Sequence, residues 1–278
     1  MASRSHNYDY TVDVESDTAA AKVVRFVGNH RRVLEVGCGP GSITKILRHK
    51  SHCSITGIEC DPKAISLVAP YCDRIVEADL NNVDWVTLAS DIGKFETIVA
   101  ADVLEHLYDP WKVLSSLKNL LRKDGEVVIS LPHVGHAAIA ACIMSGSFQY
   151  RDWGLLDRTH IRFFGLKDID DLFNQAGFSI VDVAFVITPP EETEFAETWK
   201  SLSSLVKKTL ISPLHSQVYQ VVVKASATNS EADGMSVSEA LKAIKSLSKR
   251  RVSGKARLAS LLSDKQKIFI KRMVNRGQ

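Results

Sequence analysis

The alternation of short apolar runs with helix-like segments is the feature of this sequence that most restricts its fold. Runs rich in Val and Ile alternate with segments whose apolar residues recur at helical spacing. Successive strand–helix–strand units make right-handed crossovers, so they predict an α/β fold with a parallel sheet covered by helices on both faces. The expected strands are residues 31–36, 54–59, 73–78, 95–101, 125–131, 178–187 and 217–225, and the expected helices are residues 42–49, 61–70, 109–124, 166–176 and 189–216.

Two of these helices carry recognisable end signals. Asp61 precedes Pro62, and an acidic N-cap followed by proline suits the start of a helix. In residues 109–124 the apolar residues keep helical spacing as far as Leu121, and Gly125 follows in the usual C-terminal position. The sequence therefore predicts one helix that starts at Pro62 and another that ends just before Gly125.

A glycine-rich turn, VLEVGCGPGS at residues 33–42, follows the first expected strand. Gly37, Gly39 and Gly41 stand at every second position, without the further glycine that a dinucleotide-binding fingerprint requires. Glu35 ends the strand, and a carboxylate beside a ligand disfavours phosphate and favours a cation. S-adenosyl-L-methionine carries an amine and a sulfonium, so the turn predicts this cofactor.

Two further cofactor anchors are expected at the ends of the next two strands. Glu59 in GIECD lies where a carboxylate can accept hydrogen bonds from both ribose hydroxyls. Asp79 in EADL would hold the adenine amine, with Leu80 beside the ring face. Cys60, next to Glu59, and Ala101, at the end of the fourth strand, complete the predicted cofactor-binding set.

Four motifs, VLEVGCGPGS, GIECDP, EADL and ADVLEHLYDP, resemble the successive motifs of class I S-adenosylmethionine-dependent methyltransferases. The resemblance extends over about residues 17–225, and the methyltransferase domain is expected to comprise residues 1–225. It implies a Rossmann-like, seven-stranded sheet in the order 3-2-1-4-5-7-6 with the last strand antiparallel. It also implies that the cofactor binds at the carboxyl ends of the strands, as is general for open α/β sheets.

An insertion at residues 133–165 is expected to form a small cap over the acceptor. SLPHVGH and GLLDRTHIRFFG resemble a branch of this family associated with sugar, glycan, cell-envelope, quinone and small-metabolite methylation. That branch more usually has Asn where this chain has His133. The aromatic residues of the insertion either stack on a ring of the acceptor or build the core of the cap: Phe148, Tyr150, Trp153, Phe163 and Phe164.

Transfer of a methyl group to a hydroxyl requires a group that takes up the proton, and histidine suits that role near neutral pH. His160, in a polar cluster with Asp157, is the preferred candidate, followed by His133 and then Asp102. An equally consistent interpretation of His160 is a hydrogen bond that pins the cap to the body. His106, in LEHL, is expected to pack at a helix start.

A metal site is an alternative for the same region. Asp102, Glu105 and His106 stand at i, i+3 and i+4, so a helix starting at Asp102 would place all three on one face. Carboxylates and imidazole suit Mg²⁺ or Mn²⁺, which can bind a vicinal diol. Quinone-ring and small-RNA 2′-O-methyltransferases of the resembled superfamily use a comparable set, with Glu in place of Asp102. Leu-Glu-His also occurs in relatives that need no metal.

The C-terminal region differs from the rest of the chain in charge. Residues 226–235 have linker composition. Residues 236–278 carry twelve Lys or Arg against two acidic residues, a net charge of +10, which leaves −7 for the remainder of a chain whose total is +3. This asymmetry predicts a basic, partly helical or disordered tail that is separate from the domain.

An apolar stripe at helical spacing runs through this tail and comprises Val237, Leu241, Ile244 and Leu247. Such a stripe suits peripheral contact with an anionic membrane or an acidic protein, and a solvated extension is also consistent with it. Nucleic acid is not expected as a partner, because Phe269 is the only aromatic residue in the tail.

The five cysteines are scattered without C-x-x-C spacing, which predicts free thiols and a cytoplasmic protein. No secretory leader is visible, and the longest apolar run, residues 137–144, is too short to span a bilayer. The expected function is methylation, by S-adenosyl-L-methionine, of a small-molecule or glycan hydroxyl. Two alternatives remain: a metal-assisted (Mg²⁺ or Mn²⁺) RNA or quinone-like methyltransferase, and a non-catalytic module that binds the cofactor and regulates a partner.

Overall fold

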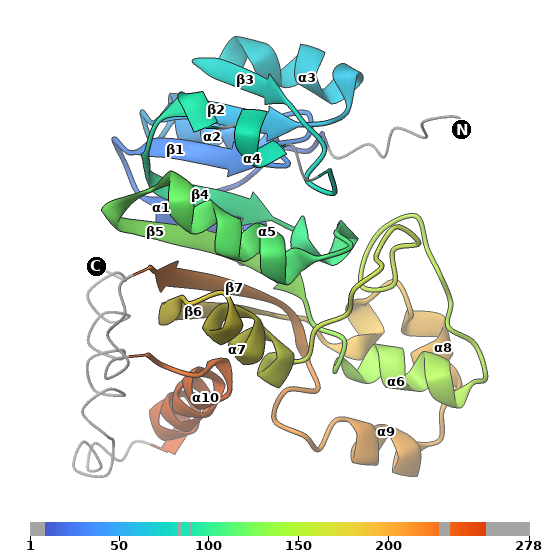
Figure 1. Ribbon diagram of the computed structural model, residues 1–278. Coiled ribbons are helices and arrows are strands. Elements are labelled where there is room, and N and C mark those ends of the chain that lie inside the picture. Colours follow the sequence, from blue (N-terminus) through green and yellow to red (C-terminus); the bar gives the residue numbers. More distant parts are fainter. Residues whose placement is uncertain (1–8, 83–84, 89, 228–233, 254–278) are drawn as a thin grey trace.

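The computed structural model describes residues 9–82, 85–88, 90–227 and 234–253. Its centre is a seven-stranded sheet in the order β3-β2-β1-β4-β5-β7-β6 (Figure 1). β7 pairs antiparallel with β5 and β6, and the other pairs are parallel. The predicted fold class and strand order are therefore confirmed. The strands are β1 (Arg32–Val36), β2 (Ser54–Glu59), β3 (Arg74–Glu77), β4 (Phe95–Ala101), β5 (Leu121–Pro132), β6 (Ser179–Ile187) and β7 (Val218–Ser226).

Helices cover both faces of this sheet, because alternate side chains of each central strand point to opposite faces. Val33, Ile55 and Val99 face a core formed with α1 and α2. Leu34 and Ile98 face a second core, formed with α5 and α7. The described helices are α1 (Ala19–Val27), α2 (Ser42–His49), α3 (Pro62–Val68), α4 (Trp85–Leu88), α5 (Pro110–Leu117), α6 (Ala137–Met144), α7 (Leu166–Gln175), α8 (Ala196–Ser201), α9 (Ser204–Leu210) and α10 (Val237–Ser253).

Side-chain caps determine where several of the helices begin. The Asp61 carboxylate accepts a hydrogen bond from the Lys63 N–H at the start of α3, and Pro62 occupies the first turn, as predicted. Asp109 caps α5 in the same way. Only two residues separate β2 from α3, whereas eight residues, including the 3₁₀ turn Leu104–His106, separate β4 from α5.

The predicted end of the helix in residues 109–124 is wrong. α5 ends at Leu117, a single 3₁₀ turn follows at Lys118–Leu120, and β5 begins at Leu121. Gly125 therefore lies within β5 and does not end a helix. Leu120 and Leu121 keep helical spacing in the sequence because both are buried against the same core, which a turn followed by a strand also satisfies.

The cap contains two segments that are far apart in the sequence. α6 and the loop after it belong to the expected insertion, and α8 and α9 lie beside α6 at one end of the sheet (Figure 1). Trp199 of α8 is buried against Ala137 and Ala141 of α6. The sequence predicted the helices of residues 189–216 but not their place in the cap.

The beginning of the C-terminal helix packs on the domain. Val237 and Leu241 are buried in the main core, where α10 lies against α7 and β6 (Figure 1). The Val237 N–H also donates a hydrogen bond to the Asp170 carboxylate (2.7 Å). The expectation that this part of the stripe is free to dock on a membrane or partner is therefore wrong, because the domain itself covers it. The Leu247 side chain and residues 254–278 lie outside the described part of the chain. None of the described helices is long and apolar enough to cross a membrane.

Candidate functional site

A cavity of about 510 Å³ opens at the carboxyl ends of β1, β2 and β4. The glycine-rich turn and the ends of these strands line one half, and the loop after β4 and the cap line the other half. Glu35, Gly37, Gly39 and Glu59 all contribute to the first half. The sheet therefore brings the predicted cofactor-binding residues of three strands to one cavity.

The glycine-rich turn needs its glycines for two different reasons. Gly37 has φ +65°, and a Cβ there would lie 2.7 Å from Cγ2 of Val103, so a side chain would collide with the loop after β4. Gly39 has φ +52° with open space around it. Gly41 starts α2 with φ +91° and packs against Val68, and it does not line the cavity. Two of the three glycines thus face the cavity, and the third shapes the start of the helix.

Glu35 is a buried carboxylate at the end of β1. Its Oε2 accepts a hydrogen bond from the Thr44 hydroxyl (2.7 Å), and its side chain lines the cavity. The pKa of Glu35 is raised to about 7, chiefly by burial; the Thr44 hydrogen bond lowers it in part, and the charge of Glu59 adds to the rise. A cationic ligand beside Glu35 would stabilise its ionised form.

Glu59, at the end of β2, orders the loops around it. Its Oε2 accepts a hydrogen bond from the Gly39 N–H (2.8 Å), and its Oε1 accepts from the N–H groups of Cys60 (2.8 Å) and Asp61 (3.0 Å). These bonds use part of the carboxylate's hydrogen-bonding capacity, and the remaining capacity lies on Oε2. Glu59 therefore holds the glycine-rich turn against β2 and keeps an acceptor position for a ligand hydroxyl.

The other predicted cofactor residues lie beside these two carboxylates. Asp79 and Leu80, after β3, line the cavity, as do Cys60 and Ala101. Oδ1 of Asp79 accepts a hydrogen bond from the Asn81 N–H (2.9 Å). The lining therefore combines carboxylates at strand ends with apolar surface and contains no described Lys or Arg. This chemistry fits S-adenosyl-L-methionine, whose amine and sulfonium are cationic and whose adenine ring is apolar on both faces.

Asp102 begins the second half of the cavity, in a conformation that excludes the expected helix. Its φ is +54°, and only a single 3₁₀ turn, Leu104–His106, follows it. The carboxylate accepts hydrogen bonds from the Ser130 hydroxyl (2.8 Å) and the Gln220 amide (2.9 and 3.0 Å). Burial raises the pKa of Asp102. The prediction that Asp102, Glu105 and His106 share one helix face is therefore wrong.

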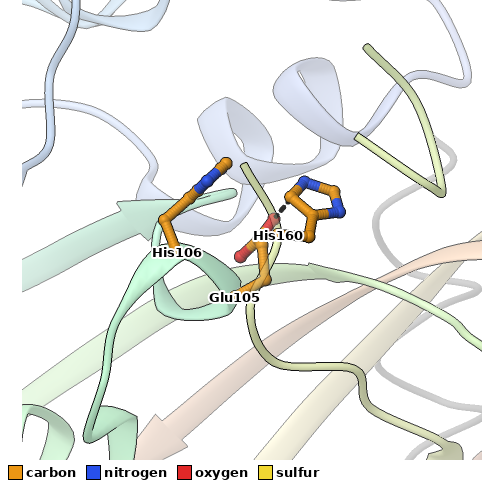
Figure 2. A group of neighbouring side chains, drawn as sticks. All are labelled: Glu105, His106 and His160. Atoms are coloured by element: carbon orange, nitrogen blue, oxygen red, sulfur yellow. Dashed lines mark ion pairs between the residues drawn. The ribbon is translucent and has the colours of Figure 1, made fainter. Parts of the chain in front are cut away.

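A different group of three side chains forms at this place. Glu105, His106 and His160 each offer a ligand atom, and these atoms lie within 4.8 Å of one another. Figure 2 shows the Glu105 carboxylate facing the His160 ring, with Nε2 of His160 3.9 Å from Oε1 of Glu105. Both carboxylate oxygens of Glu105 are buried and have no hydrogen-bond partner in the described chain. Burial holds the pKa of Glu105 well above its ordinary value and lowers that of His160 to about 4.

His106 is held in place by the cap, a contact that sequence reasoning missed. Its Nδ1 lies 3.1 Å from the Thr159 hydroxyl and 3.2 Å from the Thr159 carbonyl oxygen. The Thr159 hydroxyl in turn donates a hydrogen bond to Asp157 (2.6 Å). These contacts hold the imidazole through its Nδ1, an orientation that a general base requires. The polar composition of DRTH was the only sequence signal, and it did not indicate the partner of the threonine.

His133, the second predicted base, lies outside the cavity. Its Nδ1 hydrogen-bonds with the Val218 carbonyl oxygen (3.1 Å), and its ring packs against His215. It is buried, and burial lowers its pKa to about 4. A ring enclosed on β7 in this way has no access to an acceptor, so the expectation that His133 is a catalytic base is not supported by its position.

Three further cavity residues were missed by sequence reasoning. Tyr10 reaches the cavity from the N-terminal segment, where its N–H donates a hydrogen bond to the Ser42 hydroxyl (2.9 Å). Tyr219 and Gln220 enter from β7. Tyr10 precedes the first recognised motif, and the β7 residues follow the last one, so no motif pointed to them.

Comparison with known proteins agrees with this geometry. A family model described as a methyltransferase domain matches residues 13–183, more than half of the chain. The ubiquinone biosynthesis O-methyltransferase of Xanthomonas euvesicatoria is 23% identical over 195 residues, covering 66% of this chain and 74% of that protein. The protein of the same name from Cereibacter sphaeroides is 23% identical over 175 residues, covering 62% and 70%.

Solved structures resemble the fold. A SAM-dependent methyltransferase from Archaeoglobus fulgidus matches with a TM-score of 0.52 and 15% identity, covering 76% of this chain and 92% of that one. A SAM-dependent methyltransferase from Thermotoga maritima, described as a possible histamine N-methyltransferase, matches with a TM-score of 0.51 and 16% identity, covering 77% and 90%. At these identities the similarity establishes the shared architecture and leaves the acceptor open.

Proposed function

Since the chain belongs to the methyltransferase domain family and is an enzyme that uses S-adenosyl-L-methionine, we propose that it methylates a hydroxyl oxygen of a small molecule. The observation that carries this proposal is the two-part cavity, with the carboxylates of Glu35 and Glu59 in one half and the imidazoles of His106 and His160 in the other. The relatives from Xanthomonas and Cereibacter, both named O-methyltransferases, support oxygen as the methylated atom. The hydroxyl group of a saccharide would also be an acceptor of this kind.

Four residues would hold the cofactor. Glu35 would face its ammonium group, Glu59 one of its ribose hydroxyls and Asp79 its adenine amine, while Gly39 allows the backbone to approach closely. Bound there, S-adenosyl-L-methionine supplies a methyl group on a positively charged sulfur. The chain's own contribution is alignment of that group with the acceptor oxygen, which lowers the barrier mainly by removing orientational freedom.

The acceptor proton would pass to an imidazole in the second half of the cavity. His160 lines the cavity and is neutral at pH 7, because burial lowers its pKa to about 4. His106 lies beside it, with 4.8 Å between the ring centroids, and is oriented by Thr159. In the transfer the methyl–sulfur bond would break as the methyl–oxygen bond forms, leaving S-adenosylhomocysteine, and one of these rings would take up the proton of the acceptor hydroxyl.

The test is incubation of the protein with methyl-labelled S-adenosyl-L-methionine and fractionated host metabolites, followed by mass spectrometry. The expected product is a methyl ether on a small molecule, with turnover greatly reduced in His160→Ala at unchanged cofactor affinity. Glu59→Gln serves as the cofactor-binding control. Label found on nitrogen or on RNA would contradict the proposal.

A second candidate function is metal-assisted methylation of a quinone-like ring, and the unpartnered carboxylate of Glu105 favours it. Glu105, His106 and His160 would hold a divalent cation, a different set from the one that the sequence suggested. Such an ion would supply positive charge for a pair of acceptor oxygens. The RNA form of this alternative finds less support, since no described Lys or Arg lines the cavity.

Manganese binding separates the two candidates without any measurement of activity. A calorimetric titration with Mn²⁺ should show a bound ion in the wild-type protein and none in Glu105→Gln if the metal is used. Asp102→Asn is the matched control, because Asp102 lies outside the group of three ligands. If no ion binds the wild type, His160 remains the proposed proton acceptor.

A further inference from the structure

The structure distinguishes the aromatic residues of the cap from one another. Phe148 and Phe163 pack against the inner core of the cap, and Phe164 is buried in the main core of the domain. Tyr150 is exposed and packs edge-on against Phe148. Of these five described aromatic residues, Trp153 is the one that lines the cavity, and it is 62% exposed. A large aromatic side chain left open at a cavity mouth indicates a ligand surface more than a core residue.

The chain next to Trp153 is held firmly in place. Glu194 accepts hydrogen bonds from the Leu155 N–H (2.6 Å) and from the Tyr219 hydroxyl (3.0 Å), so it ties the cap loop to β7. Gly154 has φ +90°, and a Cβ there would collide with the Glu194 carboxylate. The indole is therefore attached to an ordered segment that is already in position before an acceptor binds.

Among the described residues, the Asp and Glu side chains that line the acceptor half of the cavity face no lining Lys or Arg. Asp102, Glu105 and Asp157 line the acceptor half of the cavity. The lining contains no Lys or Arg among the described residues, and the imidazoles of His106 and His160 are its only basic groups there. An anionic acceptor would lose its hydration in this half without gaining a positively charged partner, which is unfavourable for a buried charge.

We propose that the acceptor is a planar hydroxylated ring without negative charge, which stacks on Trp153, and that Trp153 is the specificity-determining residue of this half of the cavity. The inference rests on the proposed function and narrows its substrate class. Stacking on an indole favours aromatic and cationic groups, whereas the surrounding carboxylates exclude carboxylated or phosphorylated versions of the same ring.

Three dihydroxybenzene compounds of similar size test this selectivity: catechol, which is neutral, dopamine, which is cationic, and 3,4-dihydroxybenzoate, which is anionic. Binding is measured by calorimetry to the full chain saturated with S-adenosylhomocysteine, with no metal added. We expect catechol and dopamine to bind, and the benzoate to bind at least about tenfold more weakly. Trp153→Ala should weaken catechol binding roughly tenfold, and Trp153→Phe should retain most of it.

Tyr150→Ala is the matched control, since Tyr150 is similarly exposed in the same loop but does not line the cavity. It should bind catechol as the wild type does. Three results would each overturn the inference: equal binding of benzoate and catechol, unchanged catechol binding in Trp153→Ala, or no binding of any of the three compounds. The last result can be separated from a failure of the proposed function. If S-adenosylhomocysteine still binds and the protein methylates an acyclic hydroxyl, the proposed function holds and only the inference about the ring is wrong.

Discussion

Glu35 is expected to make cofactor binding depend on pH, because burial raises its pKa. Its pKa of about 7 belongs to a buried carboxylate without a bound cation. A cationic cofactor binds the ionised form, so the affinity should be constant above pH 7 and fall about tenfold for each pH unit below it, as the site must first lose a proton. Calorimetry with S-adenosyl-L-methionine between about pH 5 and pH 8 measures this slope.

The matched variant for this prediction is Glu35→Gln. It keeps an oxygen that can accept the Thr44 hydrogen bond and removes the titration. Its cofactor affinity should be weaker at pH 8 and nearly independent of pH. A wild-type affinity that does not change between pH 7 and pH 5 would show that Glu35 does not face the cationic part of the ligand.

Alanine substitutions at Gly37 and Gly39 separate the destabilisation caused by steric collision from that caused by backbone strain. Both have positive φ, so alanine costs roughly 1 kcal/mol of strain at either position. At Gly37 the new Cβ also meets Val103 at 2.7 Å, whereas at Gly39 it meets nothing within 4 Å. Gly37→Ala should therefore reduce the free energy of unfolding by about 1–3 kcal/mol more than Gly39→Ala does. Urea denaturation of the two variants without ligand checks this, and equal midpoints would contradict it.

At the scale of elements, the sequence predicted the features that depend on neighbouring residues, above all the positions of the strands. Short, β-branched apolar runs mark each strand locally, so the seven strands followed from the sequence pattern, whereas their order followed from the resemblance to the methyltransferases. The boundary at Leu121 did not, because helical spacing and a buried turn before a strand give the same pattern there. The orientation of His106 depends on Thr159, more than fifty residues away, and no local pattern encodes that contact.

The burial of α10 makes it a structural part of the domain, and this can be measured. Leu241 is 2% exposed in the main core, so Leu241→Ala should lower the free energy of unfolding by about 2–5 kcal/mol. Lys242 is exposed on the same helix, and Lys242→Ala should leave stability almost unchanged. If the C-terminal helix were an independent extension, neither variant would alter the denaturation curve of the domain.

For the molecule as a whole, the cavity is built from parts of the chain that are distant in the sequence. Tyr10 comes from the N-terminal segment, Glu35 and Glu59 from the sheet edge, and Trp153 from the cap. α10 packs on β6 and α7, and none of its described residues lines the cavity. Ligand binding should therefore stabilise these parts unequally. The largest effect is expected in the segments that line the cofactor half of the cavity.

Hydrogen exchange with and without S-adenosylhomocysteine tests this distribution. At about 100 times its Kd the ligand should add about 2.7 kcal/mol to the stability of the whole domain. Beyond that shared gain, the extra protection should appear in Tyr10 and its neighbours, in the glycine-rich turn and in the loop after β2, because Glu59 links the last two by hydrogen bonds. Glu59→Gln should lose most of the thermal stabilisation by the ligand. Extra protection centred on α10 would instead place the ligand near β6 and α7, away from the carboxyl edge of β1 and β2.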